Sequence, residues 1–273
     1  MSKVHFTKYD AAGNTFLVIS TQRNRLDHER YSRLAKRLCD PLDSVGADGL
    51  LTIRPTGSAD FALDVFNADG SWAERSGNGI RAAVAHALER RPRKKHWTIA
   101  CQREKIKAEV VSRSTKRTIV RAQIGVPAIQ DPRLGLIPEE PELSGQGIEY
   151  LQVSIGNPHL VIPVSSFPSA WVKLAGEIAS FEGFAGGMNV EFVRRISRSK
   201  IQVRVYERGV GQTASSGTGA AAALVALRHL GQVNEKVTVD FGSQKLTVSW
   251  PGPVRRVTVT GPALRLFDGE EEL

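Results

Sequence analysis

An internal repeat constrains the fold of this 273-residue chain more than any other feature of its sequence. Residues 13–19 read GNTFLVI and residues 156–162 read GNPHLVI, so five of seven positions are identical at an offset of 143 residues. Residues 76–79 (SGNG) match residues 216–219 (SGTG) at an offset of 140, and an alanine-rich stretch follows each copy. Because order and spacing both persist, the repeat predicts two similar structural units.

A third segment and the local sequence patterns support this division. Val65-Phe66-Asn67 aligns with Val205-Tyr206-Glu207 at the offset of 140. Stretches 79–89 and 219–229 favour helices, which gives each unit one central helix in an α/β fold. Short β-branched runs predict strands at 118–124, 201–206, 236–241, 245–250 and 254–260. The segment 127–147, rich in Pro, Gly and Glu, predicts a connecting loop between the repeats.

Composition excludes several classes of protein. A hydrophobic content of 41% is enough to give each unit its own core. The first residues contain no apolar run of secretory length, and no window approaches the twenty apolar residues that span a bilayer, so we expect a cytoplasmic protein with no membrane partner. Cys39 and Cys101 lie far apart, without a C-x-x-C or clustered histidines, and are expected to be buried residues rather than a disulfide or a zinc site.

The net charge and its distribution bear on possible anionic partners. Net charge is +9, and basic residues gather between residues 90 and 95 (RRPRKK). Such a cluster can attract phosphate, but it follows an apolar helical pattern and contains Pro92, which is typical of a solvated helix end. We therefore expect no nucleic-acid partner. The acidic segment 270–272 is expected to be a frayed end.

The two Ser-Gly-x-Gly turns are candidate anion sites. The first backbone N–H groups of a helix have no internal partners and the helix dipole is positive there, so each turn can hold a carboxylate. Two such turns could grip one carboxylate from both sides and stabilise an enolate-like charge, with Ser76 and Ser216 facing opposite sides of the bound carbon. That arrangement suits inversion of a carbon next to a carboxylate, with a proton leaving one face and arriving at the other and with no cofactor.

Each candidate residue also has an ordinary structural role. A serine before a helix is usually an N-cap, His159 could be a core or loop histidine, and Glu207-Arg208 could be a surface ion pair. Asparagine beside glycine usually holds its own turn, which applies to Asn14, Asn67, Asn157 and Asn189. Their placement at equivalent points of the repeat favours the functional roles.

Six segments together resemble the diaminopimelate epimerase family, pyridoxal-phosphate-independent enzymes that interconvert L,L- and meso-diaminopimelate. In the family's order they read AGNTFLVI, VGADGLL, FNADGSWAERSGNGIR, GNPHLVI, NVEFV and YERGVGQTASSGTGAAAA. The resemblance implies two pseudo-symmetric domains, each a barrel-like, mostly antiparallel sheet around a central helix, with the active site in the cleft between them. One domain would comprise residues 1–116 plus 262–273 and the other residues 117–261.

The resemblance also implies roles for the site residues. The backbone of Gly77-Asn78 and of Gly217-Thr218 would hold the reacting carboxylate of a small-molecule amino acid. His159 and Glu207 would support the reacting centre. The remaining implied substrate contacts are Asn67, Asn157, Asn189 and Arg208 at the distal end, with Asn14 lining the cleft. No metal or cofactor is implied, and a homodimer is compatible with the resemblance.

The chain departs from the family at the two residues that serve as catalytic acid and base. Where the family has two cysteines, this chain has Ser76 and Ser216. A helix start can bring a thiolate within reach at neutral pH, whereas a serine hydroxyl needs an adjacent general base. Four interpretations follow: serines activated by His159 or Glu207, a non-catalytic amino-acid-binding protein, an engineered inactive form, or a racemase or dehydratase for another amino acid. Gln212, where the family often has glutamate, and YDAAGNTF, which lacks the family's usual histidine, favour natural divergence.

Overall fold

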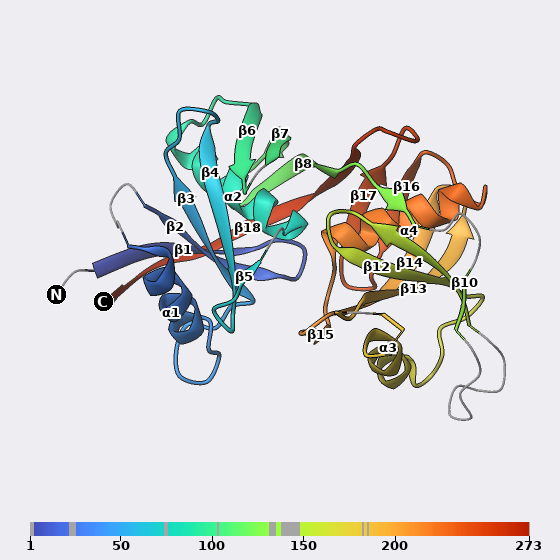
Figure 1. The fold of residues 1–273 in the computed structure, drawn as a ribbon. Coiled ribbons are helices and arrows are strands. Elements are labelled where there is room, and N and C mark those ends of the chain that lie inside the picture. The colour runs from blue at the N-terminus through green and yellow to red at the C-terminus, as the bar shows by residue number, and fades with distance from the viewer. Residues whose placement is uncertain are drawn as a thin grey trace. The chain divides into compact units, whose positions relative to one another are not determined.

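The computed structural model describes residues 3–21, 26–73, 76–102, 104–130, 135–137, 148–181, 183–184 and 186–272. It divides into two compact units (Figure 1). Unit 1 comprises Met1–Gln123 and Thr260–Leu273, and unit 2 comprises Ile124–Val259, whereas the sequence analysis placed the boundaries at 116/117 and 261/262. The predicted α/β (α+β) class, with strand-rich, barrel-like halves and few helices, is confirmed.

The strands of unit 1 form a closed barrel. β1–β2, β3–β4, β6–β7 and β7–β8 pair antiparallel, while β2–β3 and β4–β6 pair parallel. β18 pairs with β1 and with β8, which closes the sheet. The strands are β1 (Lys3–Asp10), β2 (Thr15–Ser20), β3 (Gly49–Arg54), β4 (Phe61–Asn67), β5 (Trp72–Ala73), β6 (His96–Cys101), β7 (Glu104–Arg113), β8 (Arg117–Gly125) and β18 (Val257–Glu272).

Helix α2 (Gly77–Arg90) forms the core of this barrel (Figure 1). Every residue from Gly77 to Ala85 is buried, including the polar Asn78 and Arg81, so this part of the helix has no solvent-exposed face. A helix enclosed in this way is not striped, and alanine keeps its diameter small enough for the barrel. The predicted helix 79–89 is therefore confirmed, with slightly wider bounds.

A second helix of unit 1, α1 (His28–Leu38), was missed by the sequence analysis. It begins at Asp27, whose side chain accepts a hydrogen bond from the backbone N–H of Arg30 at 2.8 Å. Tyr31, Leu34, Ala35 and Leu38 form one buried stripe. This stripe packs on a separate cluster with Leu17, Leu50 and Phe66, so α1 covers the outer face of the sheet rather than its interior.

Unit 2 repeats the plan of unit 1. Helix α4 (Gly217–His229) is buried from Gly217 to Leu227, and α3 (Trp171–Ala179) packs on β13 and β14. Parallel pairs occur at the equivalent places, β12–β13 and β14–β16. The strands are β9 (Ala128–Ile129), β10 (Gly135–Ile137), β11 (Ile148–Ser154), β12 (Pro158–Pro163), β13 (Asn189–Ser197), β14 (Lys200–Glu207), β15 (Gly211–Gln212), β16 (Lys236–Asp240) and β17 (Lys245–Ser249).

Three sequence predictions need correction. The segment 127–147 is not wholly a loop, because β9 pairs with β11 and β10 pairs with β11; residues 131–134 and 138–147 lie outside the described residues. The last predicted strand starts at Val257 rather than at Val254, whose φ of 55° places it in the left-handed region of a turn.

The acidic segment 270–272 is not a frayed end. It continues β18, where His5 lies opposite Glu270 and Lys3 lies opposite Glu272. Lys3 also forms an ion pair with Glu270 at 2.5 Å, and Glu271 pairs with Arg37 of α1 at 3.2 Å. Among the described helices, none is both long and apolar enough to cross a membrane.

Candidate active site

The two repeated serines occupy the same local geometry. Ser76 (φ −134°, ψ 112°) precedes α2, and Ser216 (φ −132°, ψ 127°) precedes α4. Each Oγ accepts a hydrogen bond from the backbone N–H of the second glycine of its turn, at 2.9 Å for Gly79 and 3.1 Å for Gly219. Both serines are therefore N-caps, and the remaining first-turn N–H groups lie beside the serine oxygen.

In unit 1 a buried arginine orders the polar residues around the helix start. Arg81 is fully buried and donates from Nη2 to Asn78 Oδ1 at 2.6 Å. Asn78 in turn donates from Nδ2 to Asn14 Oδ1, so three side chains form one chain of hydrogen bonds. Burial lowers the pKa of Arg81 to about 10, which leaves the guanidinium charged at neutral pH. The sequence analysis named Asn14 and Asn78 but not Arg81.

Asn67, the third predicted asparagine of unit 1, lies in a turn. It ends β4, is exposed, and donates from Nδ2 to Ser71 Oγ at 2.9 Å. The backbone N–H of Asn67 also donates to the carbonyl of Ser71 at 2.9 Å. These contacts fit the ordinary turn role, and they leave the Asn67 side chain at the surface of unit 1.

In unit 2 the predicted His159 belongs to a buried polar cluster. Its Nδ1 lies 2.7 Å from Glu191 Oε1, and its Nε2 lies 3.1 Å from Asn157 Oδ1. Asn157 also donates from Nδ2 to Thr218 Oγ1 at 3.5 Å, which links the cluster to the first turn of α4. The structure therefore brings together three predicted residues, and it adds Glu191, which the sequence analysis did not single out.

Glu207 lies at the end of β14, near the second serine. Its carboxylate accepts a hydrogen bond from the Thr213 hydroxyl at 3.1 Å. Burial raises the pKa of Glu207 above its ordinary value, although Thr213, Ser216 and His159 act in the opposite direction. A carboxylate whose pKa rises towards neutrality is a better general base at neutral pH. Of the two residues that the sequence analysis considered as activators of the serines, Glu207 therefore lies near Ser216.

Asn189 and Arg208 are the other two residues of unit 2 that were predicted to contact the distal end of the substrate. Asn189 is buried, donates from Nδ2 to the Pro158 carbonyl at 2.7 Å, and accepts from the backbone N–H of Arg208 at 3.1 Å. The Arg208 side chain is exposed and donates to the Gly186 carbonyl at 2.9 Å. Asn189 therefore fixes the backbone from which the Arg208 guanidinium projects.

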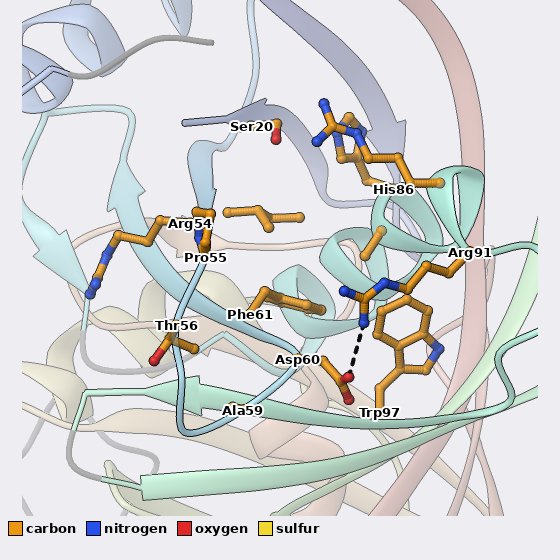
Figure 2. Close-up of a pocket in the computed structure, with 13 residues that line it drawn as sticks. Ser20, Arg54, Pro55, Thr56, Ala59, Asp60, Phe61, His86, Arg91 and Trp97 are labelled. Carbon is orange, nitrogen blue, oxygen red and sulfur yellow. Dashed lines mark hydrogen bonds and ion pairs between the residues drawn. The ribbon is translucent and has the colours of Figure 1, made fainter. Parts of the chain in front are cut away.

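A separate pocket of about 220 Å³ lies at the other end of α2 (Figure 2). Phe61 and Trp97 supply apolar lining, and Arg54 and Arg91 lie at its edge. Arg91 pairs with Asp60 at 3.3 Å, as Figure 2 shows, and Arg54 pairs with Asp64 at 2.8 Å. Because these cations already have acidic partners, we assign no anion site to this pocket.

Comparison with solved structures shows a shared fold. The chain is similar to a hydroxyproline epimerase from Agrobacterium vitis, with a TM-score of 0.75 and 14% identity over 98% of this chain and 92% of that one. It is also similar to a Bacillus anthracis protein of the PhzF phenazine biosynthesis family, with a TM-score of 0.76 and 15% identity over 100% of both chains.

Sequence relatives are closer than these structures. The family model described as diaminopimelate epimerase matches residues 6–129 and 151–265. A diaminopimelate epimerase from Carboxydothermus hydrogenoformans is 37% identical over 98% of this chain and 99% of its own length. Another from Pelotomaculum thermopropionicum is 33% identical over 98% of both. These matches show that the chain belongs to the diaminopimelate epimerase family, as its motifs predict.

Proposed function

We propose that this chain is a cofactor-independent amino-acid epimerase that inverts the α-carbon of L,L-diaminopimelate to give the meso isomer. Membership of the family supports the reaction class. The observation that carries the proposal is the position of Ser216, whose Oγ caps α4, near the Glu207 carboxylate, whose pKa is raised by burial. Serine moves protons only with an adjacent base, and Glu207 supplies one.

Proton transfer would divide between the two serines. On one face of the carbon, the α-proton passes to Ser216 Oγ while the Ser216 hydroxyl proton passes to Glu207. On the other face, Ser76 donates its hydroxyl proton to the carbon. The charge of the intermediate is delocalised into the substrate carboxylate. Solvent then removes the proton from Glu207 and returns one to Ser76, which restores both groups.

The helix starts would hold the reacting carboxylate. Gly77-Asn78 and Gly217-Thr218 supply backbone N–H groups at the positive ends of α2 and α4. His159 would stabilise charge near Ser216. Such donors contribute most when they are fixed before the reaction, and the buried contacts around Asn78 and His159 fix them.

The remaining predicted residues would recognise the far end of the substrate. Arg208 is the natural partner of a second carboxylate, because an exposed guanidinium can bind it in a bidentate manner. The amide side chains that would complete this recognition are Asn14, Asn67, Asn157 and Asn189. We propose a small-molecule amino acid as substrate, a homodimer as the assembly, the cytoplasm as the location, and lysine and cell-wall precursor synthesis as the setting.

Exchange of the substrate α-proton with deuterium, followed by NMR, tests the proposal. The chain should exchange the α-proton of L,L-diaminopimelate, and the Ser76→Cys/Ser216→Cys variant should exchange it faster. Ser216→Ala removes the hydroxyl and should abolish exchange, while Ser197→Ala, an exposed serine at the end of β13, serves as the control. Absence of exchange at high protein concentration, over a panel of amino acids, would overturn the proposal.

A second function has its own supporting observation. Both serine oxygens are engaged as N-caps, which is their ordinary structural role. A non-catalytic amino-acid-binding protein would keep these caps and the anion-binding helix starts. Binding of diaminopimelate by calorimetry, with exchange seen only when both cysteines are introduced, would favour this function over catalysis.

A further inference from the structure

The most buried charged side chain of unit 2 lies outside the predicted site. Glu191 is in the middle of β13, between Val190 and Phe192, and has no exposed surface. His159 on the adjacent parallel strand β12 is 1% exposed. Their Oε1 and Nδ1 atoms are 2.7 Å apart. A buried pair of this kind loses its hydration, so packing alone does not favour it over an apolar pair.

Unit 1 shows that the fold does not require this pair. The β2–β3 register places Phe16 opposite Gly49 and Val18 opposite Leu51. The β12–β13 register places His159 opposite Asn189 and Val161 opposite Glu191. Phe16 and Leu51 therefore occupy the positions of His159 and Glu191, and both are buried in the hydrophobic core of unit 1. The same architecture is filled by an apolar pair in one unit and by a polar pair in the other.

The two carboxylate oxygens of Glu191 have different surroundings. Oε2 is buried and has no hydrogen-bond partner among the described residues, while Oε1 is committed to His159. A Cβ atom on Gly219 would lie 2.7 Å from Oε1, so the carboxylate packs directly on the first turn of α4. The positive end of that helix favours a negative charge there. An incompletely satisfied buried carboxylate next to a proposed active site is typical of a functional constraint.

The histidine contacts show what the carboxylate can do. As oriented, Asn157 presents Oδ1 to Nε2, and Glu191 presents Oε1 to Nδ1, so both ring nitrogens face oxygen acceptors. The shorter of the two contacts, 2.7 Å to the carboxylate, favours a proton on Nδ1. The two contacts together fix the orientation of the ring.

We propose that Glu191 is a positioning residue that orients His159 and holds a proton on its Nδ1, within the cluster that reaches the first turn of α4. The catalytic benefit of this role rests on the proposed epimerase function, whereas the orientation of His159 and the proton on Nδ1 do not. In this respect Glu191 resembles the buried carboxylate that orients a histidine in serine hydrolases, where it holds the ring without itself reacting.

The test combines a spectroscopic and a kinetic measurement on the full-length chain. Nitrogen-detected NMR of the histidine rings should show a proton on His159 Nδ1 in the unmodified chain. Glu191→Leu removes the acceptor at Nδ1 and should move that proton to Nε2, which faces Asn157 Oδ1. Glu235→Leu, at an exposed glutamate of the same unit, is the control. An unchanged His159 signal in Glu191→Leu would overturn the proposal, whether or not the chain exchanges any substrate proton.

The kinetic measurement uses a variant that carries the apolar pair of unit 1 in place of His159 and Glu191. His159→Phe/Glu191→Leu introduces the pair that unit 1 already carries, so the variant should fold. Deuterium exchange should fall about 100-fold or more at saturating diaminopimelate, with little change in the half-saturating concentration. Full exchange in this variant would show that the pair is only structural. If the unmodified chain exchanges nothing, the proposed function fails, and the NMR result alone decides the role of Glu191.

Discussion

Leu51 and Glu191 lie against the second glycine of the two Ser-Gly-x-Gly turns, each in its own unit. A Cβ atom on Gly79 would be 3.1 Å from Leu51 Cδ2, and one on Gly219 would be 2.7 Å from Glu191 Oε1. The two helix starts therefore have the same backbone conformation but different electrostatic environments. Unit 2 places a carboxylate and an imidazole there, while unit 1 places apolar side chains there and a buried Arg81 one turn further along α2.

The glycines should consequently differ in their tolerance of alanine. Gly219→Ala forces Cβ into a carboxylate that His159 holds in place, so we expect the free energy of unfolding to fall by about 1–3 kcal/mol. In Gly79→Ala the new Cβ comes no closer than 3.1 Å to Leu51 or Ser76, so this substitution should cost less. Chemical denaturation measures both. Glu191→Ala should rescue Gly219→Ala in a double-mutant cycle; strictly additive effects would contradict the contact.

Removal of Arg81 should affect both stability and the binding end of unit 1. Its guanidinium donates to Asn78 and to the carbonyls of Ala11, Gly77 and Pro262. Arg81→Met removes the guanidinium donor from these acceptors, so unfolding free energy should fall by about 3–5 kcal/mol. Arg81→Lys keeps the charge but loses the planar guanidinium group. Its loss of unfolding free energy should therefore be smaller than that of Arg81→Met. Arg93→Met, at an exposed position, is the control and should change little.

His86 should make the protein sensitive to mild acid. Burial, followed by the charge of Arg90, lowers its pKa to about 4 from an ordinary 6.5. The unfolded chain therefore binds a proton in a range of pH where the folded chain does not. The stability contribution is complete above about pH 6.5 and is lost as pH falls towards 4, by up to about 3 kcal/mol. His86→Gln should flatten this dependence in urea titrations, and exposed His96→Gln should not.

Glu207 should show the opposite pH dependence. Because burial raises its pKa, the folded chain holds a proton that the unfolded chain has lost once pH passes the ordinary glutamate value. Stability therefore decreases as pH rises from that value through the raised one. Glu207→Gln should remove this decrease and be at least as stable at neutral pH, yet lose about 100-fold or more in deuterium exchange. Normal deuterium exchange in Glu207→Gln would show that Glu207 has no catalytic role.

The parts of the fold that could be predicted are those where packing leaves little freedom. Helices α2 and α4 are buried inside their units and are rich in alanine, so the repeat stayed visible at both places. Helices α1 and α3 begin at His28 and Trp171, at the same offset of 143 residues as the first repeat. They need only one apolar face, so their sequences diverged and no identity pointed to them. The stripe Tyr31, Leu34, Ala35 and Leu38 would have revealed α1.

The parts of the site that could not be predicted depend on tertiary contacts. Motifs identified His159, Glu207 and Ser216 and left open which of the first two would activate the serine; the proximity of Glu207 to Ser216 depends on the fold. Glu191 and Arg81 carry a local signal, since each is a charged residue within an otherwise apolar stretch, NVEFV and GIRAAV. The pairing of the acidic segment 270–272 with β1 had no such signal, because the two strands are separated by almost the whole chain.

Strand β18 also determines the order in which the units can be completed during synthesis. Unit 2 is continuous and has all its residues once Val259 has left the ribosome. The first segment of unit 1 precedes unit 2 in the chain, but β1 pairs with β18 from Lys3 opposite Glu272 to Asp10 opposite Leu264. Its barrel therefore cannot close until the second unit has been made. The unit that is synthesised first is finished last, and in the interval β1 presents an open strand edge that invites pairing with other chains.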